Sequence, residues 1–268
     1  MGITAFIGGG NMATALVGGL RRGGLDGRSI VVVEPDLSQR TRLAAELGVQ
    51  AIAAADATLR AADRIVWAVK PQAFRDAAVA VAPHAAAALH VSVMAGIRSS
   101  AMASALGTER IVRAMPNTPA LIGQGIAGLY ARPAVDAAGR AAGEAVLAAT
   151  GRVVWVGDEA DLDAVTALSG SGPAYVFYVA EAMVRAATEM GLDAAVGREL
   201  ALATFAGAAA LAQGSDEPLE TLRARVTSKG GTTQAALTEL QARDVADAFV
   251  AAVHAAEARA KELGDAFG

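Results

Sequence analysis

The sequence predicts an α/β N-terminal domain with a mostly parallel, doubly wound sheet, followed by an all-helical C-terminal domain. Two observations favour this fold class. Up to about residue 157, short runs rich in Val and Ile alternate with helical patterns, the order typical of parallel βαβ units. From residue 158 onward only long Ala-rich helical patterns occur, with no convincing strand. We therefore expect two domains, residues 1–157 and 158–268.

The expected strands are short and nearly continuous in apolar residues, as in a sheet that helices cover on both faces. They are Ile3–Ile7, Ile30–Val33, Ile65–Val69, Leu89–Met94, Ile111–Ala114 and Val153–Val156. Helical patterns follow the first two strands, up to Arg22 and over Ser38–Leu47. The helices expected in the second domain are Pro173–Met190, Arg198–Gln213, Leu219–Arg225 and Gln234–Leu263.

The composition is apolar without being aromatic. Of 268 residues, 54% are hydrophobic, 19% charged and 4% aromatic, which excludes intrinsic disorder. A mean hydropathy of +0.39 raises the question of a membrane. However, no uninterrupted apolar run reaches the roughly 18 residues that a spanning helix needs. We expect a soluble protein with no membrane span and a surplus of small apolar residues.

The charge and the potential metal ligands of the chain argue against two kinds of partner, nucleic acids and metal ions. The net charge is −4 and basic residues form no large cluster, so we expect no binding to nucleic acid. With no cysteine and three widely spaced histidines, we expect no metal site. The N-terminus lacks the basic region of a signal peptide, which favours a cytoplasmic protein.

A glycine-rich turn follows the first expected strand. Residues 8–13 fit the pattern GxGxxA, directly between a strand and a helix. In this motif Gly8 allows the tight turn, Gly10 lets the backbone approach a pyrophosphate, and Ala13 lets helix and strand pack closely. The N-terminus of the helix adds a positive field. We interpret this turn as a dinucleotide site; a packing turn without a ligand is the alternative.

Glu34 ends the second expected strand. An acid at this place hydrogen-bonds the ribose hydroxyls of NAD and repels the 2′-phosphate of NADP. Arg40 and Arg42 lie one helical turn further on, and Ser38 could also meet a phosphate. The sequence therefore favours NADH over NADPH only slightly, and a solvated strand end is the alternative for Glu34.

Further turns are expected at the carboxyl ends of other parallel strands, where open sheets bind ligands. Pro71 forces the chain out of one strand after Lys70; an ordinary strand-to-helix turn is the alternative there. Ala95-Gly96 supplies small residues where a nicotinamide could lie. Asn117 is a polar tip of the rigid loop Met115–Pro119.

A second glycine-rich segment, Val226–Thr233, precedes the last expected helix. Free N–H groups and the helix dipole favour an anion there, and the size of the turn suggests a small carboxylate. The hydroxyls acting only as N-caps are the alternative. Ser169–Tyr175 is a similar start from a loop into a helix, which either lines the same cleft or only begins a buried helix.

The residues that these motifs lack narrow the chemistry. Alcohol dehydrogenation needs a general base matched to neutral pH, yet the motifs contain no histidine and no carboxylate pair, and Lys70 is their only amine near the expected cofactor. An imine nitrogen can be protonated before hydride attack, so a hydroxyl or a water suffices. Thr233 is then a reasonable donor.

Five motifs together resemble the pyrroline-5-carboxylate reductase family over essentially the whole chain. They are FIGGGNMA at Phe6–Ala13, AVKPQ at Ala68–Gln72, MPNTP at Met115–Pro119, SGSGPAY at Ser169–Tyr175 and VTSKGGTTQAAL at Val226–Leu237. The resemblance implies a Rossmann domain followed by a helical dimerisation domain. It also implies reduction of 1-pyrroline-5-carboxylate to L-proline with NADPH or NADH.

The resemblance also implies the site residues. Together with Glu34, the cofactor would be bound by Ile7, Gly8, Gly9, Gly10, Asn11, Met12, Ala68, Val69, Lys70, Pro71, Ala95, Gly96 and Asn117. The substrate would be held by Ser228, Gly231, Thr232, Thr233 and Glu159, with Thr233 as the catalytic residue near the ring nitrogen. Ala55-Asp56 and Arg225 stand where many members have Asn, which leaves the cofactor preference open.

Two other functions are alternatives. A hydroxyacid dehydrogenase of similar design would carry a lysine on the helix Pro173–Met190, which has none. A sensor or scaffold that binds NAD(P)H without turnover would show a degraded loop at Ser228–Thr233, which is intact.

The surplus of apolar residues falls partly in Tyr175–Val184 and Ala201–Leu211, which are apolar nearly all round. Such helices must be buried, and a small helical domain has little interior of its own. We expect them to pack against a second chain in an obligate homodimer. Assembly into a higher oligomer stays open.

Overall fold

The protein is described by a computed structural model that covers residues 2–85 and 87–267 and forms two compact units. The first unit contains the described residues up to Ser171 and those from Ala255 onward, and the second is Gly172–His254. By contacts, residues 158–171 and the end of the last helix therefore belong with the sheet. The expected domain division at residue 157 stays a prediction.

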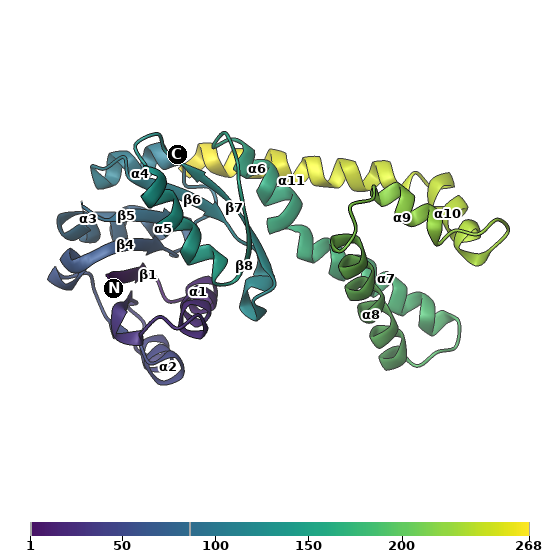
Figure 1. The fold of residues 1–268 in the computed structure, drawn as a ribbon, viewed down its shortest axis with the longest axis horizontal. Helices are drawn as coiled ribbons and strands as arrows, with labels where there is room; N and C mark the ends of the chain where they lie inside the picture. The colour runs from purple at the N-terminus through teal and green to yellow at the C-terminus, as the bar shows by residue number, and fades with distance from the viewer. Residues whose placement is uncertain (1, 86, 268) are drawn as a thin grey trace. The chain divides into compact units, whose positions relative to one another are not determined.

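The first unit holds one eight-stranded sheet in the order β3-β2-β1-β4-β5-β6-β7-β8 (Figure 1). The strands are β1 (Ile3–Ile7), β2 (Ile30–Val33), β3 (Gln50–Ile52), β4 (Ala62–Trp67), β5 (Leu89–Ser92), β6 (Ile111–Met115), β7 (Gly125–Ala131) and β8 (Gly151–Trp155). Strands β1 to β6 are parallel, β7 is antiparallel to β6, and β8 is parallel to β7. This is the doubly wound order of a dinucleotide-binding fold with two added strands, so the predicted fold class is confirmed.

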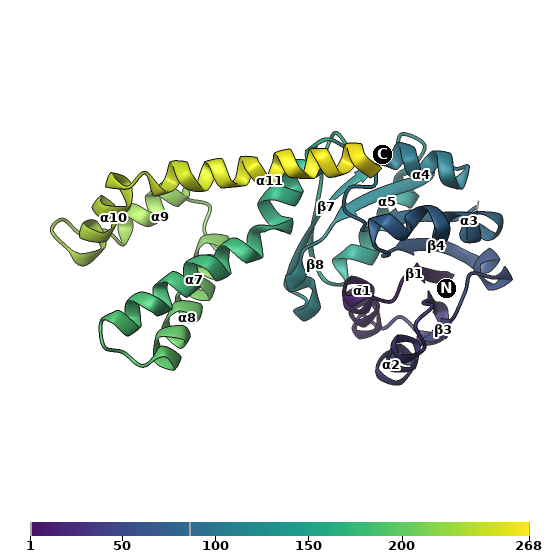
Figure 2. The ribbon, with the colours of Figure 1, turned by 180° about the vertical axis from the view of Figure 1, so that it is seen from behind.

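Helices cover both faces of the sheet (Figures 1 and 2). On one face α1 (Asn11–Arg22), α2 (Leu37–Leu47) and α5 (Ala137–Ala148) supply the core, and on the other α3 (Phe74–Ala85) and α4 (Ser99–Leu106) do so. Alternate residues of a strand serve opposite faces. In β1, Phe6 packs in the core of α1, and Ile7 packs in the core of α3 and α4.

The remaining elements of the first unit are short. They are the 3₁₀ turns Gly27–Ser29, Ala57–Ala61, Pro71–Ala73 and Thr118–Ile122, the helix α6 (Asp161–Val165) and the π-helical turn Thr166–Gly170.

The second unit is helical throughout, and in the described part of the chain no strand follows β8, as predicted. Its helices are α7 (Gly172–Glu189), α8 (Ala194–Gln213), α9 (Leu219–Arg225), α10 (Thr232–Ala242) and the first part of α11 (Val245–Phe267), which continues into the first unit. Helices α7 and α8 pack closely because Gly197 has no side chain: an added Cβ would lie 2.8 Å from the Ala187 Cβ.

Two strands were not predicted, and one expected helix was wrong. The sequence does not predict β3 or β7. The long helix expected at Gln234–Leu263 is two helices, α10 and α11, separated at Asp244, which has a left-handed φ of 51°. The helix start expected within Ser169–Tyr175 is confirmed: α7 begins at Gly172, after the π turn Thr166–Gly170.

By length and composition alone, α8 could cross a membrane, with a mean hydropathy of 1.3. It also carries Arg198 and Glu199 near its beginning. One such helix is weak evidence, and the expectation of no membrane stays a prediction.

Candidate functional site

The turns expected to bind a cofactor lie side by side at the carboxyl ends of β1, β4 and β5. The Ala68 N–H donates to the Ile7 carbonyl at 2.8 Å, and the Val93 N–H donates to the Trp67 carbonyl at 3.0 Å. The strand order changes direction between β1 and β4, which is where doubly wound sheets bind ligands. The structure thus brings three of the expected segments to one edge: residues 7–12, 68–71 and 95–96.

The glycine turn has the shape that a pyrophosphate requires. Gly8 has a φ of +95°, and a Cβ there would lie 2.8 Å from the Ala68 carbonyl oxygen, so a side chain is excluded. Nothing lies within 4 Å of a Cβ built on Gly10. No side chain caps the N-terminus of α1. Open space beside an uncapped helix start fits a phosphate group.

Glu34 is fixed at this turn. Its Oε2 accepts a hydrogen bond from the Gly9 N–H at 2.8 Å, and its Oε1 accepts one from the Asp36 N–H at 3.0 Å. The side-chain amide of Gln39 donates to the Gly9 carbonyl. A negative charge therefore stands directly against the backbone of the glycine turn.

Two of the three groups that could meet a 2′-phosphate, Arg40 and Ser38, make local contacts, and the third, Arg42, is exposed on α2. The guanidinium of Arg40 donates to the carbonyl oxygens of Glu34 at 2.8 Å and Pro35 at 2.7 Å. The Ser38 hydroxyl donates to the Asp36 carboxylate at 2.6 Å. Both side chains stabilise the start of α2.

Lys70 and Asn117 differ in their surroundings. Lys70 is exposed where the chain turns out of β4. The buried carboxamide of Asn117 accepts from the Ile126 N–H at 3.0 Å and donates to the Ser169 carbonyl at 3.2 Å. Asn117 thus ties β7 to the π turn, and its expected contact with a cofactor stays a prediction.

The second glycine-rich segment forms a compact turn at the start of α10, within the second unit. Gly230 has a φ of +74°, and its N–H donates to the Gln234 side chain at 2.5 Å. A Cβ on Gly231 would lie 2.5 Å from the Ser228 hydroxyl oxygen. Gly231 begins α10 without a side-chain cap, so N–H groups at this helix start are available to an anion. The turn also brings Ser228, Thr232 and Thr233 together.

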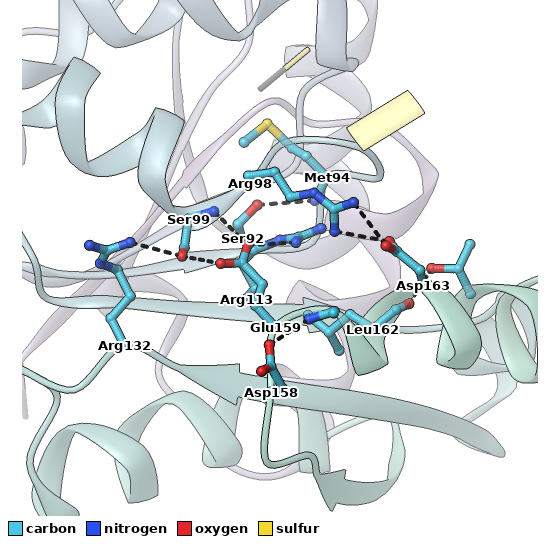
Figure 3. Close-up of polar contacts among 12 residues, drawn as sticks. Ser92, Met94, Arg98, Ser99, Arg113, Arg132, Asp158, Glu159, Leu162 and Asp163 are labelled. Atoms are coloured by element: carbon cyan, nitrogen blue, oxygen red, sulfur yellow. Dashed lines mark hydrogen bonds and ion pairs between the residues drawn. The ribbon is translucent and has the colours of Figure 1, made fainter. Parts of the chain in front are cut away.

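Glu159, the remaining expected substrate contact, lies in the first unit and is held by three donors (Figure 3). Its carboxylate accepts from the Ser99 N–H at 2.6 Å, the Ser99 hydroxyl at 2.5 Å and the Arg113 guanidinium at 2.7 Å. Burial raises the pKa of the Glu159 carboxyl, but the bonds from Ser99 and Arg113 outweigh burial and the net pKa is lowered. A contact between Glu159 and a substrate stays a prediction.

The sequence patterns did not predict the polar contacts next to Glu159. Arg98 makes a two-point contact with Asp163, at 3.1 and 2.8 Å, and Asp163 is 5% exposed. Arg132 donates to the Ser99 hydroxyl at 3.1 Å. A signal was available: Arg113 interrupts the apolar run of β6, and an arginine buried in a central strand needs an acidic partner.

Comparisons with known proteins agree with this geometry. A family model described as pyrroline-5-carboxylate reductase dimerisation matches residues 159–263, and one described as NADP oxidoreductase coenzyme F420-dependent matches residues 3–96. The pyrroline-5-carboxylate reductase of Pseudomonas aeruginosa is 43% identical over 267 residues, 98% of this chain and 97% of that protein.

Solved structures give the same result. The structure of a pyrroline-5-carboxylate reductase from Coxiella burnetii has a TM-score of 0.91 and 35% identity, covering 98% of each chain. The Plasmodium falciparum pyrroline carboxylate reductase, solved with NADP bound, has a TM-score of 0.87 and 26% identity, covering 98% of each chain. The match to a dimerisation domain supports homodimer formation.

Proposed function

The chain belongs to the pyrroline-5-carboxylate reductase family, and we propose that it reduces 1-pyrroline-5-carboxylate to L-proline with NADH or NADPH. One observation carries the proposal. The turn Ser228–Thr233 places hydroxyls around an uncapped helix start that leaves no room for a side chain at Gly231. Such a turn suits the small carboxylate of an imino acid.

The first unit fits the nicotinamide cofactor. The open space at Gly10 and the uncapped start of α1 suit the pyrophosphate, and the excluded side chain at Gly8 keeps the backbone close to β4. We propose that residues 7–12, 68–71 and 95–96 hold the cofactor, with Glu34 at its ribose. When bound, the cofactor supplies a hydride from C4 of its dihydronicotinamide ring.

The proposed reaction balances without a strong base. The hydride forms a new C–H bond at the imine carbon, the π pair of the C=N bond moves to nitrogen, and nitrogen takes one proton. The products are L-proline and the oxidised cofactor. The chain has only to hold the carboxylate, align the ring and allow a proton to reach nitrogen.

We assign the carboxylate to the N–H groups and hydroxyls of Ser228 and Thr232. Gly231 keeps the turn compact between them, since its own N–H donates to the Ser228 carbonyl at 3.0 Å. Thr233, one residue into α10, supplies the hydroxyl next to the ring nitrogen and orients the proton there. We propose that Glu159 acts on the substrate through Ser99, since its own oxygens already accept three hydrogen bonds.

For cofactor choice, we infer a preference for NADH. The Glu34 carboxylate faces the glycine turn, and neither Arg40 nor Ser38 is free of local partners. A 2′-phosphate would meet the negative charge of Glu34 at this place.

For assembly, we infer a homodimer formed through α7 and α8. Large apolar side chains of these helices are exposed on the surface of the single chain. Among them are Tyr178, 75% exposed, and Leu211, 65% exposed. Apolar surface of this extent indicates a partner. We place the enzyme in the cytoplasm, where reduced nicotinamide cofactors are regenerated, and cell fractionation tests this.

The function is tested by following NADH and NADPH oxidation with purified protein and 1-pyrroline-5-carboxylate. We expect turnover and L-proline as the product. A 2-hydroxy acid with the oxidised cofactor is the control, because α7 has no lysine to act as the base of a hydroxyacid dehydrogenase. Cofactor binding without turnover on any of these would instead support the sensor alternative.

A further inference from the structure

The Arg98–Asp163 ion pair, which has no part in the proposed reaction, lies at the end of the turn assigned to the nicotinamide (Figure 3). The turn runs from Val93 to Arg98, between β5 and α4. Ala95 is its exposed residue, while Met94 and Ile97 on either side are 3% and 1% exposed. The turn therefore presents Ala95 outward from a buried base.

The beginning of the turn is fixed to the sheet. The Val93 N–H donates to the Trp67 carbonyl at 3.0 Å, and the Met94 N–H donates to the Ser92 hydroxyl at 3.3 Å. These contacts hold the first two residues of the turn, and neither of them involves Ala95 or Gly96.

The end of the turn is fixed by Arg98. Its guanidinium makes the two-point contact with Asp163 of α6, and both side chains are largely buried, at 20% and 7% exposed. Paired hydrogen bonds between a guanidinium and a carboxylate fix direction as well as distance. The next residue, Ser99, is fixed in turn by Glu159 through its N–H and its hydroxyl.

The last helix of the chain closes the remaining side. A Cβ on Gly264 of α11 would lie 2.5 Å from the Arg98 Cζ and 2.6 Å from its Nε, so the guanidinium lies flat against the helix backbone. A Cβ on Gly96, where φ is +75°, would lie 3.2 Å from the Leu263 carbonyl oxygen. Consecutive residues of α11 thus contact both the middle and the end of the turn.

We propose that Arg98, held between Asp163 and Gly264, is a positioning residue that sets the Ala95–Gly96 turn at the distance hydride transfer requires. The inference rests on the proposed function. It assigns to the tail of α11 a role in the chemistry of the sheet unit, although all of the second unit precedes that tail in sequence. Arg98 acts through the backbone of the turn and touches neither substrate nor cofactor in this proposal.

Three variants test the proposal. Arg98→Met removes the guanidinium, and Asp163→Asn removes the charge of its partner. Gly264→Ala displaces the guanidinium without changing either member of the pair, and alanine favours the helix at that position. Two matched controls are Arg28→Met, in the exposed pair with Asp26, and Gly23→Ala, where an added Cβ meets no atom closer than 3.4 Å.

For the three variants we expect kcat to fall about 10- to 100-fold, since small misplacements of reacting groups cost this much. We expect the dissociation constant of NADH to change by less than about threefold, because binding and chemistry are separate terms. The primary isotope effect on kcat with deuterated NADH should rise, since hydride transfer becomes slower than the other steps. The controls keep the kcat of the unmodified protein.

Hydrogen exchange of the protein without cofactor gives a readout independent of activity. Amides of residues 93–99 should exchange faster in Arg98→Met and Gly264→Ala than in the controls. Unchanged exchange in this segment overturns the proposal, and so does a fall in kcat matched by an equal loss of NADH affinity. An unmodified protein without turnover contradicts the proposed function instead, and the exchange data then still decide whether Arg98 fixes the turn.

Discussion

The Glu34 carboxylate accepts a hydrogen bond from the Gly9 N–H at 2.8 Å, across the ends of the adjacent strands β2 and β1. The contact fixes a negative charge on the glycine turn. It therefore links cofactor preference to one side chain.

Replacing this charge should change the cofactor preference. In Glu34→Ser, we expect the ratio of kcat/KM for NADPH to that for NADH to rise about tenfold or more, since a tenfold change corresponds to about 1.4 kcal/mol. Steady-state kinetics with both cofactors measure the ratio. Glu46→Ser, an exposed change on α2, is the control. An unchanged ratio in Glu34→Ser would mean that Glu34 does not meet the ribose.

Substitutions of the two glycines of the motif, Gly8 and Gly10, should have different effects. Gly8→Ala forces a left-handed residue and places a Cβ 2.8 Å from the Ala68 carbonyl oxygen, so it should lower the free energy of unfolding by about 1–3 kcal/mol. Gly10→Ala has an ordinary φ of −68° and open space, so it should fold normally and bind cofactor poorly. Denaturant unfolding and NADH titration separate the two effects. Equal stability of both variants would contradict this account of Gly8.

The same motif shows which elements can be predicted from the sequence alone. The strand–glycine–helix pattern at residues 3–13 predicted β1, the turn and α1, because local backbone rules decide all three. Strand β7 was not predicted because Gly125 and Gly128 interrupt its apolar pattern. Gly128 is needed for packing: a Cβ there would lie 2.7 Å from the Val165 side chain. Packing partners distant in sequence decide this strand.

Two other features were not predicted for the same reason. They are the break between α10 and α11 and the Arg98–Asp163 pair. The apolar pattern runs on past Asp244, and only its left-handed conformation ends α10. Arg98 and Asp163 are 65 residues apart in sequence and meet only once the sheet is assembled. Periodicity and local motifs contain no information about such contacts.

Thr233 should matter for chemistry more than for binding. In Thr233→Ala, we expect kcat to fall about 10²- to 10⁴-fold, the range typical of a lost proton donor, with NADH affinity nearly unchanged. Thr238→Ala on the same helix is the control, since the Thr238 hydroxyl donates to the Gln234 carbonyl at 2.9 Å. Rapid-reaction kinetics and NADH titration give the two quantities. Full activity of Thr233→Ala would remove Thr233 from the mechanism.

His90 should make stability depend on pH. On β5, its Nδ1 accepts from the Trp67 indole N–H at 2.9 Å, and its Nε2 lies 3.1 Å from the Ala85 carbonyl, an arrangement that suits the neutral ring with a proton on Nε2. Burial lowers the pKa of His90 from 6.5 to about 4.

The sign follows from the lowered pKa. As pH falls below 6.5, the unfolded chain takes up the proton and the folded protein does not, so stability present above pH 6.5 is lost down to about pH 4. The loss is on the order of 3 kcal/mol. Denaturant unfolding from pH 8 to pH 4 should show this slope, and His90→Gln should flatten it while lowering stability at pH 8. If the unmodified protein and His90→Gln show the same slope, the pH dependence comes from groups other than His90.

The exposed apolar face of α7 and α8 predicts the assembly. Tyr178→Asp and Leu211→Asp should each convert a dimer into monomers, because a buried, unpaired charge costs several kcal/mol, which weakens association at least about 100-fold. Val79→Asp on α3 is the matched control: Val79 is 78% exposed but lies on the sheet unit, so the dimer should persist. Light scattering at micromolar concentration measures the mass. A stable monomer of the unmodified protein would contradict the dimer, whereas its recovery in the membrane fraction would favour the other use of an apolar α8.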